Sequence, residues 1–256
     1  MHLLKTFVFS CIHMWTCYCY AQDSLAGHHQ LLLVTTQGWD EKQGELVPYE
    51  RASNDSAWTA IQAPIPVVVG KNGLAWGIGL HSTNGEVSYK KEGDGKSPAG
   101  IFSLGSAFGF APGSEMRYLK MEYLALHEFI EAVDDPLSRY YNCIVDRREV
   151  IPDWQSSERM GEEPLYAIGL TVHHNFPNPK ANGGSAIFLH IWRGENSGTA
   201  GCTAMSLENL DTILSWLDRS KHPILVQLPI REYQELQNEW NLPILFSENS
   251  FGIFPP

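Results

Sequence analysis

The sequence predicts a mainly β fold with one or two peripheral helices, and two observations support this. Short runs rich in β-branched, aromatic and leucine residues recur along the chain, separated by glycine, proline and asparagine, as in all-β domains. Helical periodicity is clear in one segment, near the C-terminal end. The chain has 256 residues, of which 43% are hydrophobic, enough for one main core with a small accessory segment.

The strand-like runs are 31–36, 65–69, 99–104, 165–173, 185–192 and 224–228. The run 123–133 fits either a strand or a helix. A helix is predicted over 207–218, because Leu207, Leu210, Leu214 and Leu217 form one apolar stripe and Ser206 can cap the first turn. A second, shorter helix is expected over 231–240.

The first 21 residues differ from the rest of the chain. Lys5 is followed by an apolar run over 7–12, and the small residues Cys19 and Ala21 precede a polar stretch that begins at Gln22. This order is typical of a secretory signal peptide, so we expect an exported protein of the periplasm or cell envelope, with no membrane span after cleavage. A short membrane anchor or a buried helix is the alternative, but the apolar stretch is shorter than a span requires.

The expected organisation is therefore a signal peptide over 1–21 and one main domain over 64–228. Residues 22–63 are predicted to form N-terminal strands that pack on the main domain. Residues 229–256 are predicted to form a C-terminal helix and tail.

The charge balance is acidic, with a formal net charge of −11 at pH 7. Loss of Lys5 with the leader makes the mature chain one unit more negative. A strongly acidic surface disfavours nucleic acid or an anionic membrane as the main partner. An anionic substrate would therefore have to meet a local basic pocket.

The cysteines are the most informative part of the composition. Cys11, Cys17 and Cys19 fall in the predicted leader, so only Cys143 and Cys202 remain in the mature chain. In an oxidising compartment either these two form a disulfide, or at least one is a free thiol. The surroundings of Cys202 favour the free thiol.

Two pairs of adjacent histidines, His28–His29 and His173–His174, raise the question of a metal site. No further ligands stand at compatible spacings, so we predict no metal. Adjacent residues on a strand point to opposite faces, so one histidine of the second pair could face a cleft. His173 is taken as the candidate for contact with a substrate.

A histidine and a cysteine near one another predict a reactive site. His190 lies near the end of the run 185–192, and Cys202 follows Gly201 at a predicted strand-to-helix turn. A thiol near its ordinary pKa is mostly protonated at neutral pH, so a nucleophilic cysteine needs an imidazole or a helix N-terminus beside it. The cap at Ser206 is close enough for some help from the helix dipole. Backbone N–H groups of Gly201 and Cys202 could form an oxyanion hole. A core histidine and a buried structural cysteine are the alternative interpretation.

These residues resemble the L,D-transpeptidase catalytic domain, the YkuD-like family, in which a histidine precedes a Ser/Thr-x-Gly-Cys element. The segment Thr199-Ala200-Gly201-Cys202 fits that element. The segment 96–102, Lys-Ser-Pro-Ala-Gly-Ile-Phe, is similar to the family's Thr-Pro-x-Gly-x-Phe strand entry, with Ser97 in place of threonine. The resemblance covers roughly residues 64–228 and implies an L,D-transpeptidase-like β-sandwich or barrel.

The resemblance also implies an activity, namely acyl transfer on the stem peptides of peptidoglycan. Cys202 would attack the bond before the terminal D-alanine of a tetrapeptide stem, His190 would protonate the departing amine, and an amine or water would resolve the thioester. Such enzymes need no metal or organic cofactor.

The chain departs from the commoner family pattern, which has histidine before the Gly-Cys and arginine two positions after the cysteine. Here these positions are Ala200 and Ala204, and the spacing from His190 to Cys202 is short for the family. Other residues must bind a stem-peptide carboxylate. The candidates are Arg193 and Arg159, because a guanidinium matches a carboxylate in a bidentate way, with Thr199 and His173 beside them.

Three functions stay open at this point. The first is a transpeptidase; the second is an L,D-carboxypeptidase or related peptidoglycan amide hydrolase with the same Cys/His site; the third is a non-catalytic wall-binding protein of the periplasm. A Cys143–Cys202 disulfide would favour the third. The group that orients His190 is equally open between a side chain and a backbone carbonyl in 191–194.

Overall fold

The computed structural model describes residues 25–82 and 87–245, so the predicted signal peptide lies outside the described residues. The fold is mainly β with two α-helices in the described part of the chain, which confirms the predicted fold class. The strands are β1 (Gln30–Thr36), β2 (Gln43–Glu50), β3 (Thr59–Ala60), β4 (Ile65–Val68), β5 (Leu74–Trp76), β6 (Ser97–Gly109), β7 (Tyr123–Ala125), β8 (Ile130–Val133), β9 (Ile144–Asp146), β10 (Ser157–Arg159), β11 (Ile168–Val172), β12 (Phe188–Ile191), β13 (Thr203–Met205) and β14 (Ile224–Pro229). The helices are α1 (Leu207–Trp216) and α2 (Ile230–Leu236), and the 3-10 turns are η1 (Met160–Glu162), η2 (Pro164–Tyr166) and η3 (Arg219–Lys221).

Eight strands close into a barrel. Their order is β1-β14-β6-β11-β12-β13-β4-β2, and β2 pairs with β1 to complete the ring. β3 extends β2, while β5 and β7 pair with the long β6. Closure removes the exposed edges that an open sheet of this size would have.

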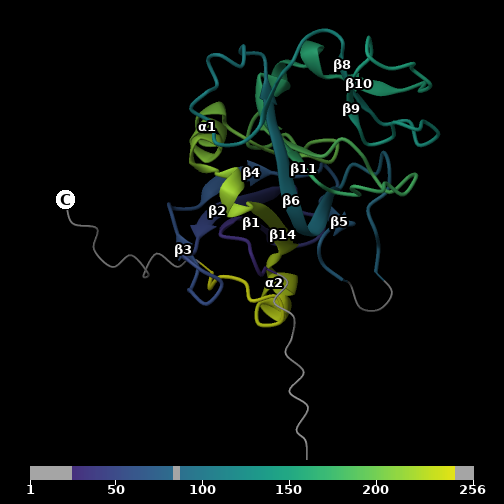
Figure 1. Cartoon of the computed structure of the whole chain (residues 1–256). Helices are drawn as coiled ribbons and strands as arrows, with labels where there is room; N and C mark the ends of the chain where they lie inside the picture. Colours follow the sequence, from purple (N-terminus) through teal and green to yellow (C-terminus); the bar gives the residue numbers. More distant parts are fainter. Residues whose placement is uncertain (1–24, 83–86, 246–256) are drawn as a thin grey trace, which may run out of the picture.

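A separate three-stranded sheet, in the order β10-β8-β9, lies between β7 and β11 in the sequence. Figure 1 shows it at the end of the molecule opposite α2. Eight buried residues join this small sheet to the barrel, and this group is called the joining cluster below. Its members are Phe108, Leu126, Ile130, Ala132, Met160, Tyr166, Phe188 and Cys202. The thiol of the predicted site is therefore part of the contact between the two sheets.

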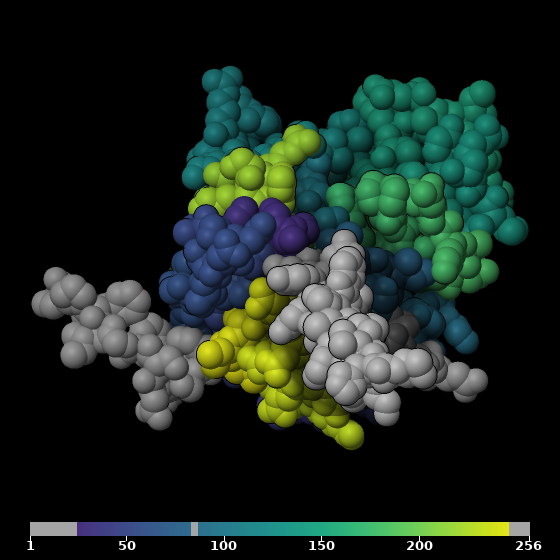
Figure 2. Space-filling view, turned by 60° about the horizontal axis from the view of Figure 1, so that its bottom comes forward, coloured from purple at the N-terminus to yellow at the C-terminus, as the bar shows by residue number. Residues whose placement is uncertain are grey.

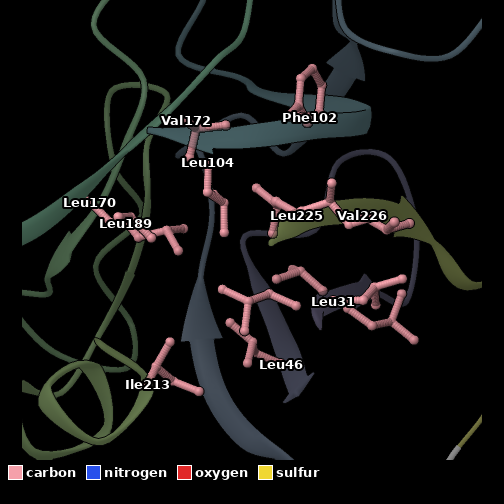
Figure 3. Close-up of a cluster of buried hydrophobic side chains, with 14 of the residues drawn as sticks. Leu31, Leu46, Phe102, Leu104, Leu170, Val172, Leu189, Ile213, Leu225 and Val226 are labelled. Carbon is pink, nitrogen blue, oxygen red and sulfur yellow. The ribbon is translucent and has the colours of Figure 1, made fainter. Parts of the chain in front are cut away.

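The main core lies on both faces of the barrel strands, because consecutive residues such as Leu225 and Val226 of β14 are both buried in it. Figure 3 shows Leu31, Leu46, Leu225 and Val226 on the neighbouring strands β1, β2 and β14, with Ile213 of α1 in the same group. Burial of each such side chain stabilises the fold by roughly 1.5–3 kcal/mol. The barrel is thus a packed support for the residues at its surface.

The two predicted helices are present, with shifted ends. Ser206 caps α1, because its hydroxyl accepts from the backbone N–H of Asn209 at 3.3 Å. Leu207 is 55% exposed, so it does not belong to the buried stripe, to which Ile213 contributes instead. The second helix begins at Ile230 and ends at Leu236 rather than continuing to 240.

Several strand predictions change at their ends. The run 165–173 begins in η2, because Pro164 stands in its first turn and the Glu163 side chain accepts from Leu165 N–H at 3.2 Å. The run 185–192 shortens to β12, and Ala186 before it has a left-handed φ of 51°. The ambiguous run 123–133 contains two short strands, β7 and β8.

The described segments before residue 64 and after residue 228 are continuous with the barrel, and the domain limits at 63/64 and 228/229 stay predictions. β1 and β2 are members of the barrel, and β14 continues to Pro229. Figure 2 shows the last described residues (yellow) beside the segment of β2 and β3 (blue). Tyr49 of β2 donates to the Ile244 carbonyl at 3.3 Å, which ties the C-terminal segment to the barrel.

The imidazoles of His81 and His174 both pack edge-on against Phe102 in β6. His174 is 1% exposed, its Nδ1 accepts from Ile78 N–H at 3.2 Å, and its Nε2 donates to the Gly183 carbonyl at 2.9 Å. Burial lowers the pKa of His174 to about 4. His174 is therefore held in the neutral form, because protonation would remove the acceptor that Ile78 needs.

Acidification from pH 7 to 4.5 should destabilise the protein. The unfolded chain protonates its histidines near 6.5, whereas folded His174 does so only near pH 4, so the free energy of unfolding falls across this window and levels off below it. His174 accounts for about 2 to 3 kcal/mol of the loss at pH 4.5. Urea unfolding followed by tryptophan fluorescence measures the change.

His174→Gln keeps a donor for the Gly183 carbonyl and should weaken this pH dependence, whereas His127→Gln, at an exposed position, should retain it. An equal pH dependence in both variants would contradict the assignment to His174.

Candidate functional site

Parallel pairing of β12 with β13 brings the histidine and the cysteine to one place. His190 stands opposite Ala204, and Cys202 directly precedes β13, two positions before Ala204. Neighbouring strands lie about 4.8 Å apart and each residue advances about 3.3 Å, so the two Cα atoms are diagonal neighbours. The register therefore places His190 and Cys202 diagonally across two neighbouring strands, and their action as a catalytic pair stays a prediction.

The local setting of Cys202 differs from the prediction in one respect. Gly201 and Cys202 lead into a strand and not into a helix, because β13 separates them from α1. The dipole of α1 acts within its first turn, so it does not reach the thiol. Ionisation of Cys202 must be controlled by other groups.

The thiol of Cys202 is buried in the joining cluster, with 7% of the residue exposed. Its Sγ accepts from the Phe188 N–H at 3.3 Å and donates to the Ala186 carbonyl at 3.4 Å. Burial, together with the nearby Glu158 carboxylate, raises the pKa of Cys202 to about 12. The resting side chain is a neutral thiol.

His190 is oriented by a backbone carbonyl. Its Nδ1 lies 2.7 Å from the Ile191 oxygen, which can only accept, so Nδ1 carries the proton. Nε2 is then unprotonated and able to act as a base. Burial lowers the pKa of His190, which keeps the ring neutral near pH 7. This resolves the open question of what orients the histidine.

Tyr166 and Glu158 are site residues that sequence patterns did not identify. The ring of Tyr166 packs edge-on against His190, with centroids 5.3 Å apart, and against Phe188, at 5.5 Å. Its hydroxyl donates to Oε2 of Glu158. Neither residue stands in a motif, and only the packing of the small sheet against the barrel brings them to the site.

The loop before Cys202 is held by hydroxyl groups. Thr199 Oγ1 donates to the Cys202 carbonyl at 2.5 Å and accepts from the Gly201 N–H at 3.1 Å, while Ser97 Oγ donates to the same carbonyl at 2.9 Å. Thr199 thus has a structural role in the loop. The Gly201 N–H already has a partner, so an oxyanion at this position would have to displace Thr199 Oγ1.

The structure explains why residue 100, in the segment 96–102, is a glycine. Gly100 has a φ of +134°, and a Cβ there would lie 1.9 Å from Cε1 of His81. A side chain at this position would displace His81, whose Nδ1 accepts from the Ile101 N–H at 3.0 Å. The second sequence motif is therefore a strand entry fixed by Ser97 and Gly100.

Most of the predicted site residues share one pocket of about 560 Å³. Cys202, His190, Thr199, Arg159 and Arg193 all contribute to its lining, together with Lys71, Glu158, Glu162, Glu163 and Tyr166. Arg159 is ion-paired with Glu162 at 3.3 Å on the surface, and the side chain of Arg193 is exposed. The pocket therefore has both basic and acidic groups around the thiol.

His173 lies elsewhere. It lines a different cavity, of about 1080 Å³, where its Nδ1 is 3.0 Å from Ser103 Oγ and its ring stacks on Phe176 at 4.2 Å. The structure thus separates His173 from the pocket that holds Cys202 and His190.

Cys143 and Cys202 are both free thiols, so the disulfide that would favour a non-catalytic protein is not formed. Among residues 25–82 and 87–245, no group of three His, Cys, Asp or Glu side chains could hold a metal ion. In the same part of the chain no helix combines the length and the apolar character that crossing a membrane requires.

Comparisons with known proteins give little further information. No protein-family model matches the chain, and no curated protein matches it. The chain is similar in structure to the helical cell shape determining protein Pgp2 from Campylobacter jejuni, with 16% sequence identity and a TM-score of 0.33. The similarity covers 78% of this chain and 47% of that chain, so this chain spans about half the length of that protein. A likeness of this extent carries no functional inference, and membership of the L,D-transpeptidase family stays a prediction.

The two free thiols should differ in reactivity without substrate. At pH 7.5, iodoacetamide should modify Cys143, which is exposed, well before Cys202, which is buried and has its pKa raised to about 12. Peptide mapping after timed alkylation measures both rates in one sample. Faster modification of Cys202 would show that its thiol is ionised in the resting protein, contrary to this structure.

Proposed function

We propose that the protein is a cysteine-dependent acyltransferase of peptidoglycan, an L,D-transpeptidase that acts through an acyl-enzyme on the tetrapeptide stem. The observation that carries the proposal is the shared pocket of Cys202 and His190, in which the Ile191 carbonyl fixes the proton on Nδ1 and leaves Nε2 as a base. A nucleophile, a base and a group that orients the base are the parts such chemistry requires. The substrate class comes from the two motifs around Ser97 and Cys202.

The first half-reaction forms a thioester. Nε2 of His190 takes the thiol proton as sulfur bonds to the carbonyl carbon before the terminal D-alanine. The tetrahedral intermediate then breaks its C–N bond, and the imidazolium returns the proton to the departing amine. D-alanine leaves, and the stem stays attached to Cys202.

In the second half-reaction an acceptor attacks the thioester. An amine acceptor loses its proton to His190 and forms a new amide, which is transpeptidation. Water in the same position gives the trimmed acid, as in an L,D-carboxypeptidase or related amide hydrolase. In both cases the sulfur leaves as thiolate and takes the proton back from the imidazolium.

A neutral resting pair suits general-base catalysis. The pKa of Cys202 is raised and that of His190 is lowered, so an ion pair does not form in the free enzyme. The proton moves only when the substrate carbonyl is in place to receive the sulfur. Only neutral imidazole acts as the base. The value of kcat/KM should therefore fall as the pH drops below the pKa of His190, which itself lies below 6.5.

The substrate carboxylate is assigned to Arg193, and Arg159 is the second arginine in the lining of the same pocket. Arg193 is exposed, whereas Arg159 already contacts Glu162. An exposed guanidinium is available for a bidentate contact. The proposed partner is therefore the stem peptide of the wall, in the periplasm or cell envelope, and the scheme needs no metal or organic cofactor.

Intact-mass spectrometry of the mature protein with a tetrapeptide muropeptide tests the proposal. The wild type should gain the mass of the stem without its terminal alanine, or convert the substrate, while Cys202→Ala should do neither. Cys143→Ala is the matched control and should behave as the wild type. Cross-linked products identify a transpeptidase and trimmed products a hydrolase. The absence of both adduct and turnover in the wild type would refute the proposed function.

Arg193→Ala should raise KM about tenfold and change kcat less, since loss of one charge-assisted hydrogen bond costs about 1.5 kcal/mol. Arg193→Lys should recover part of this loss. Steady-state kinetics with the same muropeptide provide the measurement, and Arg219→Ala, which lines the larger cavity, serves as the control. An unchanged KM in Arg193→Ala would exclude Arg193 from substrate binding.

A further inference from the structure

We propose that the cavity of about 1080 Å³ around His173 is a second binding site, which takes an uncharged saccharide of the kind found in the N-acetylated glycan strands of the cell wall. This cavity is called the larger cavity below, and the pocket of Cys202 is called the smaller pocket. The link between a glycan in the larger cavity and a stem peptide in the smaller pocket rests on the proposed function. Binding of a saccharide alone does not, and it can be tested by itself.

The larger cavity and the smaller pocket meet at residues 186–188. Ala186 and Phe188 line the larger cavity, and Cys202 lines the smaller pocket. The Cys202 Sγ donates to the Ala186 carbonyl at 3.4 Å and accepts from the Phe188 N–H at 3.3 Å. The thiol is therefore hydrogen-bonded to the wall of the larger cavity. A glycan bound there would lie next to the pocket assigned to its peptide.

A β-bulge in β6 gives the larger cavity a polar floor. Two residues of β6, Gly105 and Ser106, stand opposite the single residue Thr171 of β11. A bulge re-aims side chains and is common beside functional sites. Gly105 and Ser106 are consecutive, yet both are half-buried and both line the cavity, whereas a regular strand would turn one of them away. Thr171 Oγ1 donates to the Ser106 carbonyl at 2.7 Å, which stabilises the bulge and keeps both hydroxyl side chains in the lining.

An aromatic platform lies beside this floor. His173 stacks on Phe176 with ring centroids 4.2 Å apart, and Nδ1 of His173 is 3.0 Å from Ser103 Oγ. Gly105 makes room for the imidazole, because a Cβ there would lie 2.5 Å from Nε2 of His173. Phe176 is 52% exposed although His173 covers one side of its ring, so the other face is open. The C–H groups on one face of a hexose can pack on such a ring while its hydroxyls bond to the neighbouring serine, threonine and imidazole groups.

The larger cavity differs from the smaller pocket in charge. Six charged side chains line the smaller pocket, namely Lys71, Glu158, Arg159, Glu162, Glu163 and Arg193. Among the described residues that line the larger cavity, Glu122 and Arg219 are the only acidic and basic side chains apart from histidine, and they form an exposed ion pair with each other. Burial lowers the pKa values of His28, His173 and His174, which favours their neutral forms. An uncharged ligand therefore fits this cavity, and it needs no contact with Glu122 or Arg219.

The larger cavity also has the size and the apolar surface that suit an N-acetylated saccharide. Its volume of about 1080 Å³ slightly exceeds the range of roughly 300–1,000 Å³ for sites of drug-sized ligands, so more than one sugar ring fits. Phe108, Ala132 and Phe188 of the joining cluster contribute an apolar part of the lining, which matches the methyl groups of the acetamides. A fully apolar ligand would not use the hydroxyl groups of the floor, which favours the saccharide.

Titration of the mature wild-type protein with tetra-N-acetylchitotetraose tests the proposal, because this probe carries neither a peptide nor a charge. NMR spectra of the backbone amides should show shifts for residues 103–106 and 171–173, which line the cavity. Phe176→Ala should raise the dissociation constant about fivefold, as expected for the loss of one aromatic stacking contact. Phe176→Trp keeps the platform and should retain the affinity.

Phe110→Ala is the matched control variant. Phe110 is 41% exposed, which is similar to Phe176, but it does not line the larger cavity. Its substitution should leave the affinity for the saccharide unchanged. Tetragalacturonate is the matched control ligand, since it is a sugar chain of the same length with a carboxylate on each ring, and it should bind more weakly than the uncharged probe.

Steady-state kinetics test the link to the thiol. With a disaccharide-tetrapeptide muropeptide, Phe176→Ala should raise KM about fivefold and change kcat little, because the lost contact is made equally in the ground state and the transition state. With the free tetrapeptide, the same substitution should change neither constant. An equal rise in KM for both substrates would overturn the link between the two sites.

The proposal would be overturned by a wild type that does not bind the tetrasaccharide, by unchanged affinity in Phe176→Ala, by an equal loss in Phe110→Ala, or by tighter binding of tetragalacturonate. Failure of the proposed function has a different signature, since the muropeptide would then give neither adduct nor turnover while the tetrasaccharide still binds.

Discussion

The carbonyl oxygen of Cys202 is the point on which the site depends. It accepts from Thr199 Oγ1, three residues before it, and from Ser97 Oγ, at the start of β6. A buried carbonyl without partners costs about 1 to 3 kcal/mol, so both hydroxyls have a reason to be there. The bond from Ser97 ties the backbone that carries the thiol to a segment 105 residues away in the sequence. The Ser-Pro-x-Gly and Thr-x-Gly-Cys patterns are in this sense two halves of one structural contact.

Local patterns were sufficient to predict six of the eight barrel strands and the cap at Ser206, because periodicity and capping depend on neighbouring residues. The catalytic pairing of His190 with Cys202 stays a prediction. Local patterns did not predict barrel closure. β2 contains Gly44 and Pro48 and has no clean alternation, and β13 is only three residues long. Sequence patterns did not identify Glu158 and Tyr166 as pocket residues for a similar reason. Their place in the site follows from the packing of two sheets, which no short segment encodes.

Burial explains why Cys202 and His190 are both uncharged in the free protein. Desolvation raises the pKa of Cys202 and lowers that of His190, so both residues are neutral near pH 7. Neutral groups are the cheaper ones to bury. The Ile191 carbonyl nevertheless fixes the tautomer, which leaves Nε2 of His190 unprotonated. The same burial that makes the pair unreactive in isolation would strengthen interactions with a substrate that excludes water.

Two parts of the structure contribute residues to the site: the barrel, and the segment between β7 and β11. Their sequences are constrained to different degrees. The barrel supplies Cys202 and His190 through the β12–β13 register, and any change there would disturb the closed sheet. The segment between β7 and β11 supplies Glu158, Arg159 and Tyr166, and its sheet is joined to the barrel by the joining cluster. Residues of this segment can therefore change the charge and shape of the pocket without altering the register that brings the thiol to the imidazole. It follows that the barrel sets the positions of Cys202 and His190, whereas the inserted segment supplies charged groups to the wall of their pocket.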